Sequence, residues 1–251
     1  MSEESPTKVT VADVPASHGW LWIRQGFALV RKAPLMWWVV LGLWFLGYLI
    51  LRAVFGLYGE IAFALIYPAL SAGLMLGCQA LENGEELEPA HIVAGFRRNV
   101  QQLLLLGIVT LIIGLAIAWV VSLVLPPDPE NVKLLDTPGA DLRPVLPWLL
   151  QTMAVQFLAS LPILMAMWFA PALLVFHDMS AAHAIRWSFY ACIANIGAFI
   201  VYGFASVGLF ILASIPLGLG LIVLIPVLVA STYISYRDIF ASSGTAKSEA
   251  A

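Results

Sequence analysis

The chain has 251 residues, of which 61% are hydrophobic and only 11% are charged, and its formal net charge is −3 at pH 7. A soluble domain has about 25% charged residues, so these proportions exclude an ordinary water-soluble fold. The small net charge and the lack of a basic run argue against nucleic-acid binding. Because the charged residues are segregated from long uncharged stretches, the sequence predicts an all-α protein that crosses a membrane several times.

The N-terminal segment is polar. Residues 1–19 contain three acidic side chains and one lysine, and no basic start precedes a short apolar core. We therefore expect no cleavable signal peptide. The expected organisation is a polar tail at 1–18, a membrane domain at 19–240 and a second tail at 241–251.

Six segments are long and apolar enough to span a bilayer, since a spanning helix needs about 20 mostly apolar residues. In chain order they are 34–51, 61–81, 103–125, 153–175, 196–214 and 219–235. Residues 145–150 are expected to form a separate entering segment before the fourth span. A proline and two glycines within 215–220 predict the turn between the last two spans.

Lysines and arginines are distributed unevenly between the connecting segments. Three lie on one side of the six-span arrangement, namely Arg52, Lys133 and Arg143, and nine lie on the other, namely Lys8, Arg24, Arg31, Lys32, Arg97, Arg98, Arg186, Arg237 and Lys247. Positive charge gathers on the cytoplasmic side of membrane proteins. We therefore expect both termini in the cytoplasm, and the acidic, proline-rich loop 126–144 outside, without a folded domain.

The spans form three similar units, each a short amphipathic segment, a span outward and a span back. The return spans share a proline followed by small or apolar residues, at Pro68, Pro171 and Pro226. Three paired repeats are therefore expected within the bundle.

The amphipathic segments carry basic residues opposite apolar ones. The apolar faces are Trp20, Ile23, Phe27 and Val30; Ile92, Val93, Phe96 and Val100; and, more weakly, Ile185, Phe189 and Cys192. The opposite basic face comprises Arg24, Arg31 and Lys32 in the first unit and Arg97 and Arg98 in the second. Such helices lie at the membrane surface, where anionic lipid attracts them. They either bind lipid or a partner, or anchor the bundle.

The most site-like polar cluster is His177, Asp178, His183 and Arg186. Histidine and aspartate at a helix end can ligate a metal or move a proton. However, His177 and Asp178 are adjacent and face different directions on a helix, and His177 and His183 are not four residues apart. We interpret the cluster as a polar cap, and expect no catalytic, cofactor or metal site.

The predicted spans contain no Asp, Glu, Lys, Arg or His. Ion-coupled transporters and proton pumps usually need such groups inside the membrane, so this absence argues against both. Ala69, Gly73 and Gly77 form a strip of small residues at four-residue spacing, which lets a helix of the bundle or of a second copy approach closely. Pro162 and Pro171 predict a bend in the fourth span, which either opens a cavity or only shapes the bundle.

Several motifs are distinctive: Val14-Pro15-Ala16 with Arg24-Gln25-Gly26, Trp168-Phe169-Ala170-Pro171 with His177-Asp178, Asn195 with 197–203, and Tyr233 with Ser235-Tyr236-Arg237 and Phe240. With them the chain resembles, from about 14 to 240, an uncharacterised family of proteobacterial multi-pass inner-membrane proteins. The resemblance implies a bacterial inner-membrane location and six helices. It implies no activity.

Besides a membrane enzyme built on His177, Asp178 and His183, two functions remain open. The first is a non-enzymatic accessory, scaffold or assembly partner, which the uncharged spans and the basic segments favour. The alternative is a carrier or exporter of an uncharged or lipophilic solute, with a cavity beside the bent fourth span. The expected partners are the lipid bilayer and a second copy or another membrane protein, and no nucleic acid.

Overall fold

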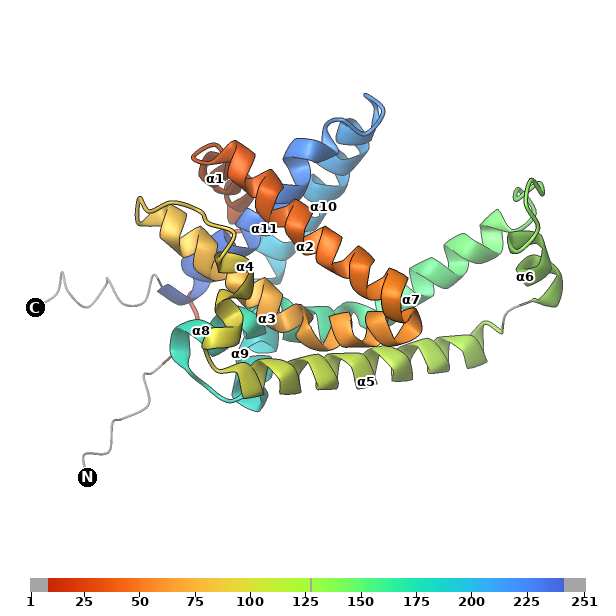
Figure 1. Cartoon of the computed structure of the whole chain (residues 1–251), viewed down its shortest axis with the longest axis horizontal. Coiled ribbons are helices and arrows are strands. Elements are labelled where there is room, and N and C mark those ends of the chain that lie inside the picture. Colours follow the sequence, from red (N-terminus) through yellow and green to blue (C-terminus); the bar gives the residue numbers. More distant parts are fainter. Residues whose placement is uncertain (1–8, 127, 242–251) are drawn as a thin grey trace, which may run out of the picture.

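The computed structural model describes residues 9–126 and 128–241, and the regular structure in these ranges is helical (Figure 1). The tail residues 1–8 and 242–251, with Lys8 and Lys247, lie outside the described ranges. The elements are α1 His18–Val30, α2 Pro34–Phe55, α3 Leu57–Glu82, α4 His91–Ala94, η1 Gly95–Arg97, α5 Val100–Val124, α6 Pro129–Leu135, α7 Leu146–Trp168, α8 Ala170–His177, α9 Ala181–Ala194, α10 Ile196–Ser214, α11 Leu221–Tyr236 and the π-helical turn η2 Arg237–Ala241.

Six stretches of the described chain are long and apolar enough to cross a membrane: α2, α3, α5, α7 with α8, α10, and α11 with η2 as far as Phe240. The predicted all-α, multi-spanning bundle is confirmed. The turn expected at 215–220 separates α10 from α11, and the backbone there has positive φ at Leu217 (54°) and Gly218 (80°).

The helices reach further than the predicted spans at several ends. The first span continues past Arg52, and the second begins before Glu60, with a sharp turn at Gly56 (φ 55°) between them. Arg52 Nε lies 3.3 Å from Glu60 Oε1, so the two charges offset each other at the tip of this helix pair. Charged residues are therefore present in the spanning helices, but near their ends.

The fourth span differs most from its prediction. Residues 145–150 are not a separate entering segment, because α7 starts at Leu146 and continues to Trp168. Pro147 lies in the first turn of α7. Proline is tolerated there because the backbone N–H that it lacks would have no acceptor within the helix. The loop 126–144 also contains the short helix α6, whose start is capped by Asp128 Oδ1, an acceptor for the Glu130 N–H at 2.9 Å. An aspartate before a proline is a recognised helix start, so this helix was predictable.

The two spans of each pair are buried to different extents. In their most apolar windows the outgoing spans α2, α5 and α10 are 6%, 17% and 11% buried, whereas the return spans α3, α7–α8 and α11 are 50%, 44% and 56% buried. The return spans thus form the core, and the outgoing spans expose apolar side chains, as helices facing hydrocarbon do.

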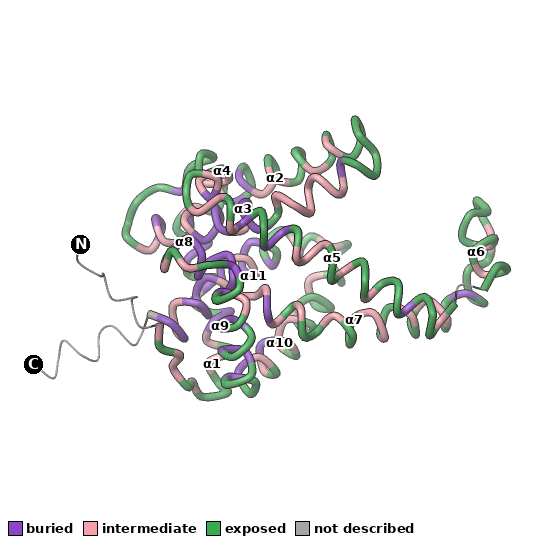
Figure 2. The backbone as a smooth tube through the Cα atoms, turned by 90° about the horizontal axis from the view of Figure 1, so that it is seen from below, coloured by how far each residue is buried: buried purple, intermediate pink, exposed green. Residues whose placement is uncertain are grey.

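Buried residues are concentrated at one end of the molecule, which we call the hub (Figure 2). The hub comprises α1, α4, η1 and α9 together with the last turns of α3, α8 and α11. The span pairs extend away from the hub in different directions (Figure 1).

Candidate functional site

The short helix that opens each unit packs on the return span of another unit. The helices α4 and η1 pack on α3, α9 packs on α7 and α8, and α1 packs on α11 and α10. The second unit therefore contacts the first, the third contacts the second, and the first contacts the third. The three units close into a ring at the hub.

The contact between α1 and α11 depends on Gly26. A Cβ atom added to this residue would lie 2.8 Å from the carbonyl oxygen of Val227 and 2.9 Å from the nitrogen of Ser231. One turn of α11 therefore lies directly against the backbone of α1. Gly19, two turns earlier, meets α10 in the same way at Ala198 and leaves no room for a side chain.

The contact of η1 with α3 has the same form at Gly95. A Cβ atom there would overlap the carbonyl oxygen of Ala69 and lie 3.1 Å from the nitrogen of Gly73. A Cβ at Gly77 would likewise lie 2.7 Å from a methyl carbon of Leu87. The small-residue strip Ala69, Gly73 and Gly77 is thus occupied within the chain by the start of the second unit.

In the third contact, between α9 and the fourth span, a serine takes the place that glycine has in the other two. Ser188 on α9 is fully buried, and its hydroxyl donates to the carbonyl oxygen of Met165 at 2.7 Å and accepts from the N–H of Phe169 at 2.9 Å. In an uninterrupted helix this N–H and this carbonyl would bond to each other. The serine hydroxyl is inserted between them, and α7 ends at this point. An inserted side chain is a known cause of a helix break, and Pro171, whose ring clashes with the carbonyl four residues earlier, adds to it.

In all three contacts the small residue lies between a carbonyl and the N–H four positions later. This register makes Ala69, Met165 and Val227 equivalent. Pro68 and Pro226 then correspond as predicted, but Pro171 does not, because it lies seven positions after Leu164, the residue in the matching place. The sequence does carry a signal for this register, since the pattern Ile-x-x-small-Phe occurs at 23–27, 92–96 and 185–189.

The predicted apolar face of α1 is only partly buried. Ile23 and Val30 are buried, but Trp20 and Phe27 are 46% and 43% exposed, and the packed side also includes Gly19, Trp22 and Gly26. Close helix contact in a membrane favours small residues, so the glycines face the bundle and the two bulky rings remain outside.

The predicted basic face is exposed at all five positions, Arg24, Arg31, Lys32, Arg97 and Arg98. Lys32 Nζ also donates to the carbonyl oxygen of Leu81 at 2.7 Å and so joins α3 to the segment before α2. The guanidinium of Arg31 lies 5.9 Å from the ring centre of Phe27. Basic side chains therefore cover the outside of the hub.

The cluster predicted around His177 does not assemble into a site. His177 Nε2 is hydrogen-bonded to the Tyr236 hydroxyl at 2.9 Å, and His183 Nδ1 to the Ser180 hydroxyl at 2.8 Å. Asp178 and Arg186 are exposed. Within residues 9–126 and 128–241, no group of three His, Cys, Asp or Glu residues could hold a metal ion.

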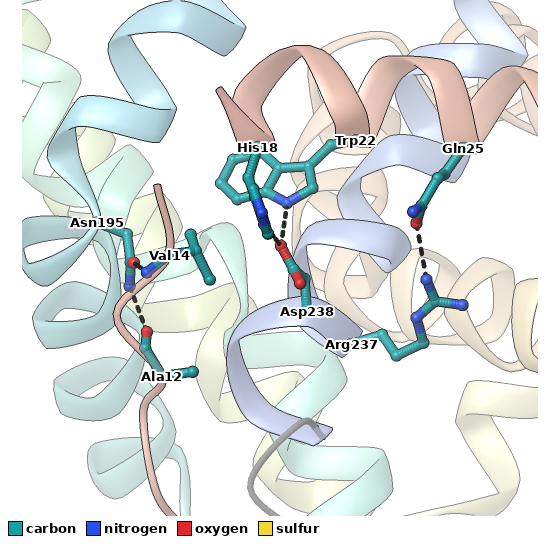
Figure 3. Close-up of polar contacts among 8 residues, drawn as sticks. All are labelled: Ala12, Val14, His18, Trp22, Gln25, Asn195, Arg237 and Asp238. Atoms are coloured by element: carbon teal, nitrogen blue, oxygen red, sulfur yellow. Dashed lines mark hydrogen bonds and ion pairs between the residues drawn. The ribbon is translucent and has the colours of Figure 1, made fainter. Parts of the chain in front are cut away.

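Other polar side chains, among them Gln25 and Arg237 of the distinctive motifs, connect the first and last helices at the hub. Asp238 accepts hydrogen bonds from His18 Nδ1 and Trp22 Nε1, both at 2.8 Å, and Arg237 donates to Gln25 at 2.8 Å (Figure 3). Arg237 is also paired with Glu82, which accepts a hydrogen bond from the Tyr233 hydroxyl at 2.6 Å. These groups close the ring between the first and third units.

Asn195 fastens the segment before α1 to the same end of the molecule. Its side chain accepts from the Val14 N–H at 2.8 Å and donates to the carbonyl oxygen of Ala12 at 3.0 Å (Figure 3). It also donates to the carbonyl oxygen of Ala191 at 3.0 Å. The hydrogen bonds of Asn195, Asp238 and Arg237 thus hold the N-terminal segment and the first and last helices together.

A cavity of about 760 Å³ lies between the spans, and we call it the intramembrane cavity. Ligand pockets have about 300–1,000 Å³. Its walls come from α2, α3, α5, the bent fourth span and α11, and none of the lining residues is Asp, Glu, Lys, Arg or His: Trp38, Leu41, Gly42, Trp44, Phe45, Tyr67, Pro68, Ser71, Leu74, Met75, Leu106, Thr110, Ile163, Leu164, Met167, Trp168, Pro171, Ile225, Val229 and Thr232. The bend at Phe169 therefore accompanies a cavity, one of the two outcomes expected for the fourth span.

Comparison with known proteins supports the membrane assignment. The chain is 28% identical over 236 residues to a protein of Burkholderia thailandensis named "Probable inner membrane protein". The matched region covers 88% of this chain and 82% of the relative. No family model matches the chain. No solved structure matches it either. The chain is an inner-membrane protein with six apolar spanning helices, as its resemblance to an uncharacterised inner-membrane family implied.

Proposed function

We propose that the protein binds an uncharged, lipophilic molecule in the intramembrane cavity and serves as its carrier, without enzymatic chemistry. The supporting observation is the cavity itself, which is large enough for a small ligand and is lined almost wholly by apolar side chains. A buried charge without a partner is costly in an apolar site, so such walls favour a neutral ligand. Among the two functions left open by the sequence, this geometry favours the carrier.

A matched pair of glycines on α2 provides the test. Gly42 lines the cavity, whereas Gly47 does not, and an added Cβ meets nothing within 4 Å at either position. Gly42→Leu should fill the cavity without a backbone clash. We expect protein purified from membranes in mild detergent to lose a co-purifying lipophilic compound in Gly42→Leu and to retain it in Gly47→Leu, as measured by solvent extraction and mass spectrometry. Equal amounts in the two variants would contradict the proposal.

Transport can be measured with the same variants in reconstituted vesicles. Gly42→Leu should abolish the flux of the identified compound, and Gly47→Leu should not. Gln156 and Pro162 lie outside the cavity lining, and the Gln156 amide instead donates to the Ser160 hydroxyl at 3.5 Å. Gln156→Ala is therefore a second control, with unchanged flux expected.

We also infer that the hub faces the cytoplasm. Seven of the nine basic residues that the sequence assigned to the inner side lie in the described chain at or beside the hub, and Arg52, Lys133 and Arg143 lie toward the opposite ends of the spans. The bias toward positive charge inside supports this orientation. Reporter fusions after Gly84 and Ser180 should behave as cytoplasmic, and a fusion after Asp136 as external. The reverse pattern would contradict the inference.

A scaffold or assembly role is the second candidate. It is supported by the outgoing spans α2, α5 and α10, which expose apolar side chains to which either lipid or another membrane protein can bind. Purification in mild detergent followed by native mass spectrometry should then reveal a stoichiometric protein partner or a self-oligomer. A monomer without a protein partner would argue against this role and leave the carrier proposal intact.

A further inference from the structure

The dimensions of the intramembrane cavity suit a chain-like ligand. Its lining residues extend along α2 over 38–45, along α3 over 67–75, along the fourth span over 163–171 and along α11 over 225–232. Seven or eight residue steps of helix correspond to about 11–12 Å. One leaflet of a bilayer has a hydrocarbon depth of about 15 Å. The cavity therefore extends over about three quarters of the depth of one leaflet.

The cavity lies in the half of the bundle next to the hub. Trp38 is four residues after the start of α2, and Pro171 is six residues before the end of α8, so both are about 6–9 Å from the hub ends of their helices. On α2 the wall includes Gly42 and Phe45, which are exposed. Lipid of the hub-side leaflet therefore has lateral access to the cavity.

The apolar side chains of the lining suit a hydrocarbon, and two of its hydroxyl groups are already hydrogen-bonded, whereas the buried Trp44 Nε1–H has no acceptor among the described residues. The Thr110 hydroxyl donates to the carbonyl oxygen of Leu106 at 2.7 Å, and the Thr232 hydroxyl to that of Leu228 at 3.2 Å. Both hydroxyl protons are thus used inside their own helices. A saturated chain needs no donor, whereas a ligand carbonyl buried here would lose its hydrogen bonds to water without gaining one from these threonines.

A basic residue lies where a headgroup would be. Lys32 is two residues before α2, and its ammonium group has two N–H groups besides the one directed at Leu81. A lysine near the surface of a bilayer attracts anionic lipid by about 1 kcal/mol. We infer that the intramembrane cavity binds one acyl chain of a phospholipid of the hub-side leaflet, with the phosphate beside Lys32. This inference rests on the proposed function and names its ligand class.

Photolabelling in vesicles tests this inference. The full-length protein is reconstituted with phosphatidylglycerol that carries a photoreactive diazirine on one acyl chain, and the adducts are mapped by mass spectrometry. We expect adducts in 38–45 and 163–171, because both segments line the cavity. These adducts should be lost in Gly42→Leu and retained in Gly47→Leu. Lys32→Gln should weaken them, whereas Arg24→Gln, which removes another exposed charge of the hub, should not.

The outcomes separate this inference from the proposed function. Equal labelling of the two segments in Gly42→Leu and Gly47→Leu would overturn the inference, as would displacement of the label by excess polyprenol but not by excess unlabelled phosphatidylglycerol. Unchanged labelling in Lys32→Gln would overturn the headgroup position. If a different lipophilic compound still co-purifies in a manner that depends on Gly42, the proposed function stands and only the acyl chain is wrong.

Discussion

Gly95→Ala is expected to lower the free energy of unfolding by about 1–3 kcal/mol, the range typical of overpacking. The added Cβ would overlap the Ala69 carbonyl oxygen. This oxygen belongs to the backbone of α3, so it cannot move away as the end of a flexible side chain can. Gly95 has φ −59° and ψ −31°, values that alanine adopts freely, so backbone strain makes no contribution. The loss would come from separating η1 from α3, which opens the ring between the first two units.

The control is Gly114→Ala in α5, where an added Cβ meets nothing within 4 Å. This change should leave stability unchanged or raise it by about 0.5–1 kcal/mol, because alanine is the better helix former. Gly26→Ala should resemble Gly95→Ala, since the two glycines have equivalent contacts. Thermal unfolding in detergent, followed by size-exclusion chromatography, measures all three variants. Similar midpoints for Gly95→Ala and Gly114→Ala would show that the packing at Gly95 is not close.

Ser188→Ala is the second change with a large expected effect. It removes the hydroxyl that bonds both the Met165 carbonyl and the Phe169 N–H in a fully buried place. A buried group left without a partner costs about 1–3 kcal/mol, and the two groups can bond to each other only if the break between α7 and α8 closes. We therefore expect a loss of stability of that size, together with an altered fourth span.

The altered span can be detected at the cavity. Met167, Trp168 and Pro171 line the cavity and lie beside the break, so Ser188→Ala should change the yield of photolabelling in 163–171 as well as the unfolding midpoint. The control is Ser122→Ala, which removes an exposed serine whose hydroxyl donates to the Trp119 carbonyl of its own helix. That change should shift stability by less than about 0.5 kcal/mol. A null effect of Ser188→Ala on both measurements would contradict the role of the inserted hydroxyl.

The ring explains how a protein with few polar residues in its membrane segments holds its helices in place. Apolar side chains supply little drive for association between helices in lipid, because the lipid tails are equally apolar. Close backbone contact at Gly26 and Gly95 and the hydrogen bonds of Ser188 supply it instead. The hub charges add to this, since Asp238, Arg237 and Glu82 join helices that are far apart in the chain.

Much of the architecture was predictable from sequence alone, because the bilayer imposes a one-dimensional rule. A span must be about 20 apolar residues long. Because these residues are contiguous, a span can be recognised from the sequence without knowledge of the tertiary structure. The six spans and the turn at 215–220 followed from that rule and from glycine and proline positions. The three-unit pattern followed from the amphipathic segments together with Pro68 and Pro226, whereas Pro171 is out of register. The prediction of the fourth span was less accurate for two reasons. Pro147 lies in a first turn and so does not stop the helix. The break at Phe169 depends on Ser188, which is nineteen residues away in the sequence.

Only the tertiary structure decided which face of each helix packs and which polar residues meet. Helical periodicity placed Trp20 and Phe27 together, but it could not show that Gly19 and Gly26 face the bundle, because that depends on the backbone of α10 and α11. His177 likewise pairs with Tyr236 rather than with its sequence neighbours. The sequence by itself determined that the chain spans the membrane six times, since hydrophobic length is a local property. The ring and the cavity arise from contacts between distant segments, and such contacts are set by three-dimensional packing.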